Sequence, residues 1–252
     1  MKRVLVPVPS YGFDPTEAAV PWHCLRQAGH HLTFATPDGA PAQADERMLT
    51  GMELPALFKS SLMARADAVA CYRELENAPE FRSPISYAAS QEAAFDALLL
   101  PGGHDKGMRP YLESAVLQAR VSAFFLANKP VAAICHGTLL AARSLSGEHS
   151  VLWGRKTTGL TRRQELFAWR LTRARLGDYY RTYETPMMDE LVSRLRSASD
   201  YSAGPGFPIP LTRDSKQRRN GFTVRDANYV SARWPGDAWT FAQVFLELLQ
   251  QA

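Results

Sequence analysis

An apolar run that ends at a cysteine, within residues 131–142, constrains the fold of this chain more than any other stretch. The apolar residues 131–134 are followed directly by Cys135, and His136 and Gly137 then precede small, helix-forming residues. A strand that turns this sharply into a helix lifts the side chain at the turn above the sheet. We expect the helix N-terminus to lower the pKa of the thiol and so prepare a nucleophile. The alternative is a small core cysteine, the usual state of a free thiol, but the adjacent His-Gly and a glycine turn upstream favour the nucleophile.

Apolar strands alternate with helices along the chain, which is typical of a parallel, doubly wound α/β sheet. Strands are expected at residues 2–8, 31–36, 95–100 and 131–134, with hairpins at 151–159 and 221–232. Helices are expected at residues 14–28, 111–127, 162–176, 189–196 and 238–249. The sequence therefore predicts one α/β domain over residues 1–252, with an insertion near residues 40–92 that packs over the sheet.

Composition excludes several other classes of protein. The net charge of +4 is mild, and acidic residues are interleaved with the arginines, so we expect a solvated surface and no nucleic-acid partner. No apolar run is long enough to span a bilayer and no signal-peptide pattern is present, so no membrane partner is expected. Three widely separated cysteines without metal-ligand spacing fit free thiols in a reducing cytoplasm.

Several chemically useful residues follow the expected strands and should meet at their carboxyl ends. The turn at Gly102 and Gly103 follows one strand, as Cys135 follows another. The backbone N–H groups of Gly103 and His136 could together form an oxyanion hole. His104 either lines the crevice or ligates a metal; because no second and third ligands stand at a convincing spacing, we expect no metal.

The cysteine also needs a base and an orienting acid. His136 is the closest base in the sequence. Glu165, in the first turn of a helix that Thr161 caps, is a candidate to orient it, and Glu17 could reach the crevice and share a proton with the sulfur. Both glutamates have the same alternative: acids in a first helical turn are stabilised there by the helix dipole.

Five segments occur in an order that resembles the ThiJ/PfpI superfamily, which is a flavodoxin-like relative of the class I glutamine amidotransferases. They are residues 13–21, 34–39, 100–104, 133–137 and 231–236. Within that superfamily the chain is most similar to the branch of heat-inducible chaperones and glutathione-independent glyoxalase III enzymes. The resemblance implies a flavodoxin-like sheet with helices on both faces, a nucleophile elbow, a stress-response role and a homodimer.

The resemblance also implies roles for individual residues. Those roles are the elbow nucleophile for Cys135, the acid bonded to the thiol for Glu17, the histidine of the Cys-His pair for His136, the triad acid for Glu165, and the oxyanion turn for Gly102 and Gly103. Two departures stand out: Thr138 replaces the proline of many members, and residues 167–220 form a longer, arginine-rich insertion that could reshape the pocket mouth or the dimer surface.

The leading hypothesis is a cofactor-independent cysteine enzyme that acts on a small reactive aldehyde, converting methylglyoxal to lactate, or on a glycated adduct. A cysteine hydrolase with the same Cys135 and His136 is an alternative, as a deglycase or a peptidase-like enzyme. A redox-sensing holdase chaperone, with Cys135 oxidised beside Glu17, is another. A glutamine amidotransferase is disfavoured because no His-x-Glu pair follows His149.

Overall fold

The structure is a computed structural model that describes residues 1–206, 213–217 and 219–251. Within these residues, the strands of the main sheet are β1 (Arg3–Pro7), β3 (His31–Thr36), β5 (Ile85–Ser86), β6 (Ala97–Leu100), β7 (Val131–Ile134), β10 (Thr223–Asp226) and β11 (Tyr229–Ala232). Their order across the sheet is β10-β11-β7-β6-β1-β3-β5, and all neighbours run parallel except β10 and β11. The predicted doubly wound, mostly parallel fold is confirmed.

Helices cover both faces of this sheet. Among the described residues they are α1 (Pro15–Gln27), α2 (Glu46–Thr50), α3 (Lys59–Leu62), α4 (Ala66–Glu76), α5 (Pro79–Arg82), α6 (Ala89–Glu92), α7 (Arg109–Leu112), α8 (Ala115–Leu126), α9 (Gly137–Arg143), α10 (Arg162–Leu176), α11 (Met187–Ser193) and α12 (Ala238–Gln251). Helix α1 packs against α4 and α12, while α8 packs against α9 and β6. Strands β6 and β7 are fully buried as a result, which explains their continuous apolar sequences.

Shorter elements complete the description. Short strands are β2 (Tyr11–Phe13), β4 (Gln43–Ala44), β8 (Leu145–Ser146) and β9 (His149–Ser150), and 3-10 turns are η1 (Ala56–Phe58), η2 (Lys106–Met108), η3 (Ala198–Asp200) and η4 (Pro235–Asp237). None of the helices in the described part of the chain is long and apolar enough to cross a membrane.

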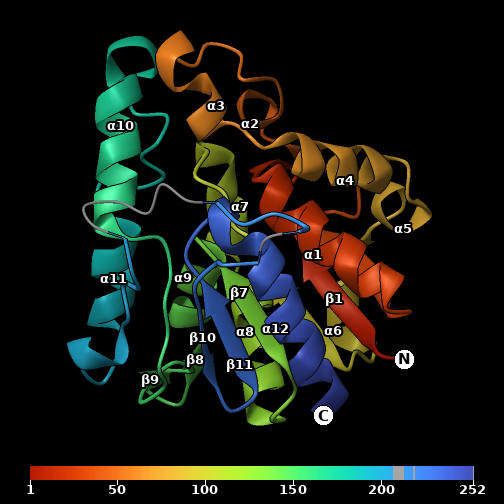
Figure 1. Cartoon of the computed structure of the whole chain (residues 1–252). Helices are drawn as coiled ribbons and strands as arrows, with labels where there is room; N and C mark the ends of the chain where they lie inside the picture. Colours follow the sequence, from red (N-terminus) through yellow and green to blue (C-terminus); the bar gives the residue numbers. More distant parts are fainter. Residues whose placement is uncertain (207–212, 218, 252) are drawn as a thin grey trace.

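The strand order places a ligand crevice between β1 and β6. From β1 the chain adds β3 and β5 on one side, and it then returns to add β6 and β7 on the other. Ligands bind at such switch points, outside the carboxyl ends of the strands. In Figure 1, α10 and the segment of α2 and α3 stand over that end of the sheet.

Two sequence predictions of secondary structure are wrong. The helix expected at residues 111–127 is broken into α7 and α8, because the side chain of Ser114 accepts a hydrogen bond from the Leu117 N–H at 3.2 Å and starts a new helix. The hairpin expected at 151–159 is instead formed by β8 and β9, and Thr157 makes one isolated bridge with Tyr201. Of the insertion expected at 167–220, residues 207–212 and 218 lie outside the described residues.

Candidate active site

Cys135 stands at a strained turn between β7 and α9. Its φ of +55° is a left-handed conformation that costs a non-glycine residue about 1–2 kcal/mol. One backbone and one side-chain hydrogen bond hold the turn: the Cys135 N–H donates to the Ala232 carbonyl at 3.1 Å, and the Thr138 hydroxyl donates to the Cys135 carbonyl at 2.7 Å. The sequence thus forms the elbow that its pattern predicted, and Thr138 is one of its supports.

Glu17 reaches the elbow from the first turn of α1. Asp14 caps that helix, because its carboxylate accepts from the N–H groups of Thr16 at 2.8 Å and Glu17 at 3.1 Å. The Glu17 side chain is fully buried, and its Oε2 accepts from the Gly102 N–H at 2.9 Å. Its Oε1 accepts no hydrogen bond of ordinary geometry from the described residues. The group that stands beside the carboxyl and can hydrogen-bond to it is the Cys135 thiol.

Burial controls the protonation of Glu17 and Cys135. It raises the pKa of Glu17 well above its usual value, and the Asp14 carboxylate raises it further. Burial also raises the pKa of the Cys135 thiol, although the backbone N–H of His136 acts to lower it. The expected lowering of the thiol pKa is therefore wrong in direction, because desolvation of the sulfur outweighs the helix N-terminus. Burial thus favours the protonated form of both groups, the Cys135 thiol and the Glu17 carboxyl.

His136 is positioned as a neutral base beside the sulfur. The side chain is buried, and its Nδ1 lies 3.6 Å from the Cys135 Sγ. Burial lowers the pKa of the imidazole to about 3, and the nearby His104 and Arg143 contribute in the same direction. An uncharged imidazole can accept a proton at neutral pH.

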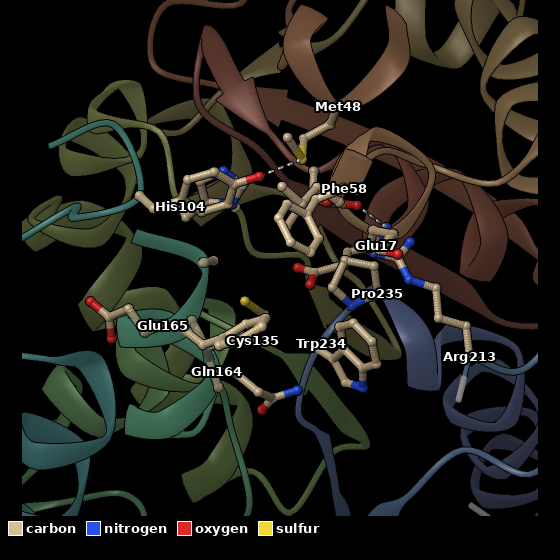
Figure 2. A pocket seen from close by; sticks show the side chains of 18 of the residues that line it. Glu17, Met48, Phe58, His104, Cys135, Gln164, Glu165, Arg213, Trp234 and Pro235 are labelled. Carbon is tan, nitrogen blue, oxygen red and sulfur yellow. Dashed lines mark hydrogen bonds between the residues drawn. The ribbon is translucent and has the colours of Figure 1, made fainter. Parts of the chain in front are cut away.

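Glu165 lies in the pocket wall, with its carboxylate directed to other partners. Its Oε2 accepts from the Met187 N–H at 2.9 Å, and its Oε1 lies 3.8 Å from the Arg181 Nε. In Figure 2 the carboxylate is turned away from the Cys135 sulfur. Burial raises the pKa of Glu165 to about 7. Neither oxygen hydrogen-bonds His136 in the described structure, so the triad role of Glu165 stays a prediction.

The glycine turn after β6 closes against the elbow. A Cβ on Gly102 would lie 2.7 Å from both the Glu17 Oε2 and the backbone nitrogen of His136, so only glycine fits between them. Gly103 and His104 line the pocket. The His104 ring stacks on Tyr180 with centroids 4.1 Å apart, and burial lowers its pKa to about 4. No group of three or more His, Cys, Asp or Glu residues in the described part of the chain is arranged to hold a metal ion.

A pocket of about 650 Å³ opens above the sulfur. We call Asp14, Glu17, Gly103, His104 and Cys135 its floor. We call the other lining residues its roof, and they come from three segments: Met48, Phe58, Ser60, Ser61, Leu62 and Arg65; Leu160, Gln164, Glu165, Phe167, Ala168, Leu171 and Tyr180; and Arg213, Trp234 and Pro235. Figure 2 shows the Cys135 sulfur with labelled roof residues, among them Phe58, Trp234 and Pro235, around it.

Apart from Glu165, the roof is the part of the site that sequence reasoning missed. Arg213 ties two of its segments together, because its guanidinium donates to the carbonyls of Ser61 at 2.8 Å and Met63 at 3.0 Å and lies over the Trp234 ring at 4.9 Å. One signal was available: Trp234 and Pro235 fall in residues 231–236, which carried the resemblance but had no role assigned.

Comparison with known proteins identifies the family of this chain. A family profile described as ThiJ/PfpI family-like matches residues 8–205. An uncharacterized protein of Schizosaccharomyces pombe is 28% identical over 151 residues, which are 59% of this chain and 53% of that protein, so the chain spans about half the length of this relative.

Solved structures share the fold across nearly the whole chain. Glyoxalase III from Candida albicans has a TM-score of 0.65 at 17% identity, covering 98% of this chain and 97% of its own. The Rapid Encystment Protein of Francisella tularensis has a TM-score of 0.68 at 16% identity, covering 99% of both chains. Drosophila melanogaster DJ-1beta has a TM-score of 0.56 at 18% identity, covering 98% and 90%. With the family profile spanning most of its length, the chain belongs to the ThiJ/PfpI-like family.

Proposed function

We propose that this chain is a cysteine enzyme that converts a reactive α-ketoaldehyde to the corresponding 2-hydroxy acid without a cofactor. The observation that carries the proposal is the arrangement around the Cys135 sulfur. A buried carboxyl, Glu17, and a neutral imidazole, His136, both stand beside it. The glyoxalase III neighbour shares the fold and supports the same class of reaction.

The proposed reaction begins when the Cys135 sulfur adds to the aldehyde carbon. The carbonyl oxygen becomes an alkoxide, which takes the proton held by the Cys135–Glu17 pair to give a hemithioacetal. The backbone N–H groups of Gly103 and His136 are the expected donors to the developing alkoxide.

Proton transfer then moves the oxidation level from one carbon to the next. His136 takes the proton from the former aldehyde carbon while the ketone oxygen gains one, which gives an enediol. The hydroxyl of the first carbon then loses its proton as a proton is added to the neighbouring carbon. The product is a thioester of the 2-hydroxy acid on Cys135. Water hydrolyses the thioester, releases the acid and restores the thiol, so the net change is the addition of one water molecule to the substrate.

Lactate formation from methylglyoxal tests the proposal. We expect purified protein to form lactate and Cys135→Ala to lose turnover by at least about a thousandfold, because no other group in the scheme can form the covalent intermediate. Cys24→Ala is the matched control, since Cys24 lies on α1 away from the pocket lining and should keep the full rate. A normal rate from Cys135→Ala would exclude the mechanism.

A cysteine hydrolase is the second candidate, because the pocket is larger than a three-carbon substrate requires. It would use the same Cys135 nucleophile on an ester or amide carbonyl. Labelling of Cys135 by an acyl-type probe, with no 2-hydroxy acid formed from any ketoaldehyde, would favour hydrolysis over the aldehyde reaction.

A further inference from the structure

The pocket above Cys135 has far more space than methylglyoxal would fill. Its volume of about 650 Å³ lies within the roughly 300–1,000 Å³ typical of sites for drug-sized ligands. At roughly 30 Å³ for each water molecule in the liquid, this is the space of about twenty waters. A three-carbon ketoaldehyde at the sulfur would leave most of that space filled with water.

The space is bounded mainly by apolar side chains. Those of the roof include Phe58, Phe167, Ala168, Leu171, Trp234 and Pro235. Figure 2 shows the rings of Phe58, Pro235 and Trp234 next to one another on one side of the Cys135 sulfur. Water against such surfaces is displaced favourably by an apolar group, at about 25 cal/mol per Å² of apolar surface covered.

Some polar groups of the roof are engaged with the protein itself, whereas the Gln164 Nε2, Glu165 Oε1 and Trp234 Nε1 atoms are buried without a hydrogen-bond partner among the described residues. Arg213 donates to two backbone carbonyls, and the Gln164 Oε1 accepts from both the N–H and the hydroxyl of Thr161. Glu165 accepts from the Met187 N–H. These contacts hold the walls in place and leave the apolar faces directed to the ligand.

We propose that the substrate carries a bulky apolar group, aryl or branched alkyl, on the ketone carbon next to the reacting aldehyde. This inference rests on the proposed function and specifies its substrate class. The aldehyde carbon lies at the Cys135 sulfur on the floor, and the apolar group lies against Phe58, Trp234 and Ala168 in the roof. The chain is then an arylglyoxal or branched-alkylglyoxal enzyme in preference to a methylglyoxal enzyme.

A comparison of phenylglyoxal with methylglyoxal tests the substrate class. We expect kcat/KM for phenylglyoxal to be at least about tenfold higher, because even a single extra methylene in an apolar pocket is worth roughly ten- to two-hundredfold. Formation of mandelate and of lactate would be measured separately. Equal values, or a preference for methylglyoxal, would overturn the inference.

A bulky residue placed in the roof tests where the selectivity comes from. Ala168→Phe adds a ring on α10 inside the pocket, and we expect the ratio of the two kcat/KM values to fall by about tenfold or more. Ala174→Phe makes the same substitution at an exposed position of the same helix outside the pocket lining, so its ratio should not change. An unchanged ratio in Ala168→Phe would contradict the proposed position of the apolar group.

Binding to the Cys135→Ala variant separates failure of this inference from failure of the proposed function. Acetophenone and acetone are unreactive ketones that differ in the same group, and calorimetry should show binding of acetophenone only, weakened by Ala168→Phe. Binding of acetophenone without turnover of either glyoxal by the native protein would reject the ketoaldehyde reaction and retain the apolar pocket. Turnover of methylglyoxal without acetophenone binding would reject the pocket inference and retain the reaction.

Discussion

The floor of the pocket is held by hydrogen bonds to backbone groups at adjacent strand ends, whereas its roof is held by side-chain contacts, those of Arg213 among them, between segments distant in sequence. On the floor, Glu17 is fully buried and bonded to the Gly102 N–H, and Cys135 is tied to the Ala232 carbonyl. In the roof, Phe58 is half-buried and Phe167 is 39% exposed. Few neighbours constrain such side chains, so substitutions at these positions should leave the sheet undisturbed.

This difference separates reaction from recognition. The floor fixes which atoms exchange protons, because a small displacement there changes the contact between Glu17, Cys135 and His136. The roof fixes which substrates fit, because it supplies most of the apolar surface. We therefore expect floor substitutions to lower the rate with every substrate by a common factor and roof substitutions to change the ratio between substrates.

The largest expected effect follows from Glu17→Gln. The amide keeps the size of the side chain and can still accept from the Gly102 N–H, but it cannot shuttle a proton to the sulfur. We expect kcat to fall by about 10²–10⁴ for methylglyoxal and phenylglyoxal alike. Steady-state kinetics with both substrates measures this, with Glu46→Gln as the control at an exposed acid in the first turn of α2. A fall in kcat for only one of the two substrates would contradict the separation of reaction on the floor from recognition in the roof.

A smaller effect is expected from Gly137→Ala, which tests the rigidity of the floor. A Cβ at this position would lie 2.1 Å from the backbone oxygen of Leu100, and the start of α9 cannot move away without displacing the elbow. We expect the free energy of unfolding to fall by about 3 kcal/mol, measured by denaturant titration. Gly147→Ala is the comparison, since a Cβ there meets nothing within 4 Å and only its φ of +65° opposes the change, at about 1 kcal/mol. Equal losses would show that the floor adapts as easily as a surface turn.

The last effect is a pH dependence that arises in the roof. Burial raises the pKa of Glu165 from its ordinary value of about 4.5 to about 7 in the folded protein. Because the folded state binds the proton more tightly, the contribution of this group is complete below pH 4.5 and is lost as the pH rises through 7. Glu165→Gln lacks this titration, so its stability relative to the native protein should increase by about 3 kcal/mol between pH 4 and pH 8.

Denaturant titrations of both proteins across that range measure the difference. Asp14 and Asp214 also titrate near pH 6, but they are present in both proteins and cancel in the comparison. A difference that is constant with pH would show that Glu165 keeps an ordinary pKa and that the roof remains open to water around it.

Most of the floor was predictable because its signals are local. The run at 131–137 specifies the strand, the elbow and the helix within seven residues, and Asp14 caps the helix that presents Glu17. Convergence of these residues follows from the rule that parallel strands share one carboxyl end. The resemblance to a known family then supplied the expected roles, which the geometry of Cys135, Glu17 and His136 accommodates.

The roof was not predictable because it depends on long-range packing. Nothing local to Arg213 indicates that it bonds the Ser61 carbonyl, more than a hundred residues earlier. The same reason explains the wrong expectation for the Cys135 thiol, since a helix N-terminus is visible in sequence whereas the desolvation that raises the pKa is not. Glu165 likewise lies where its helix was predicted, but its hydrogen bond goes to the Met187 N–H.

The hydrogen bond from Cys135 to Ala232 has a consequence for the newly made chain. Strand β7 gains its second neighbour, β11, only when residues 229–232 have been synthesised, and Trp234 and Pro235 follow directly. At about 5–20 residues per second, the thiol exists for roughly 5–20 s without the strand that fixes its backbone. The reactive sulfur is thus synthesised well before β11, Trp234 and Pro235, which complete the pocket around it. Pairing of the C-terminal hairpin with β7 is the last step in forming the elbow.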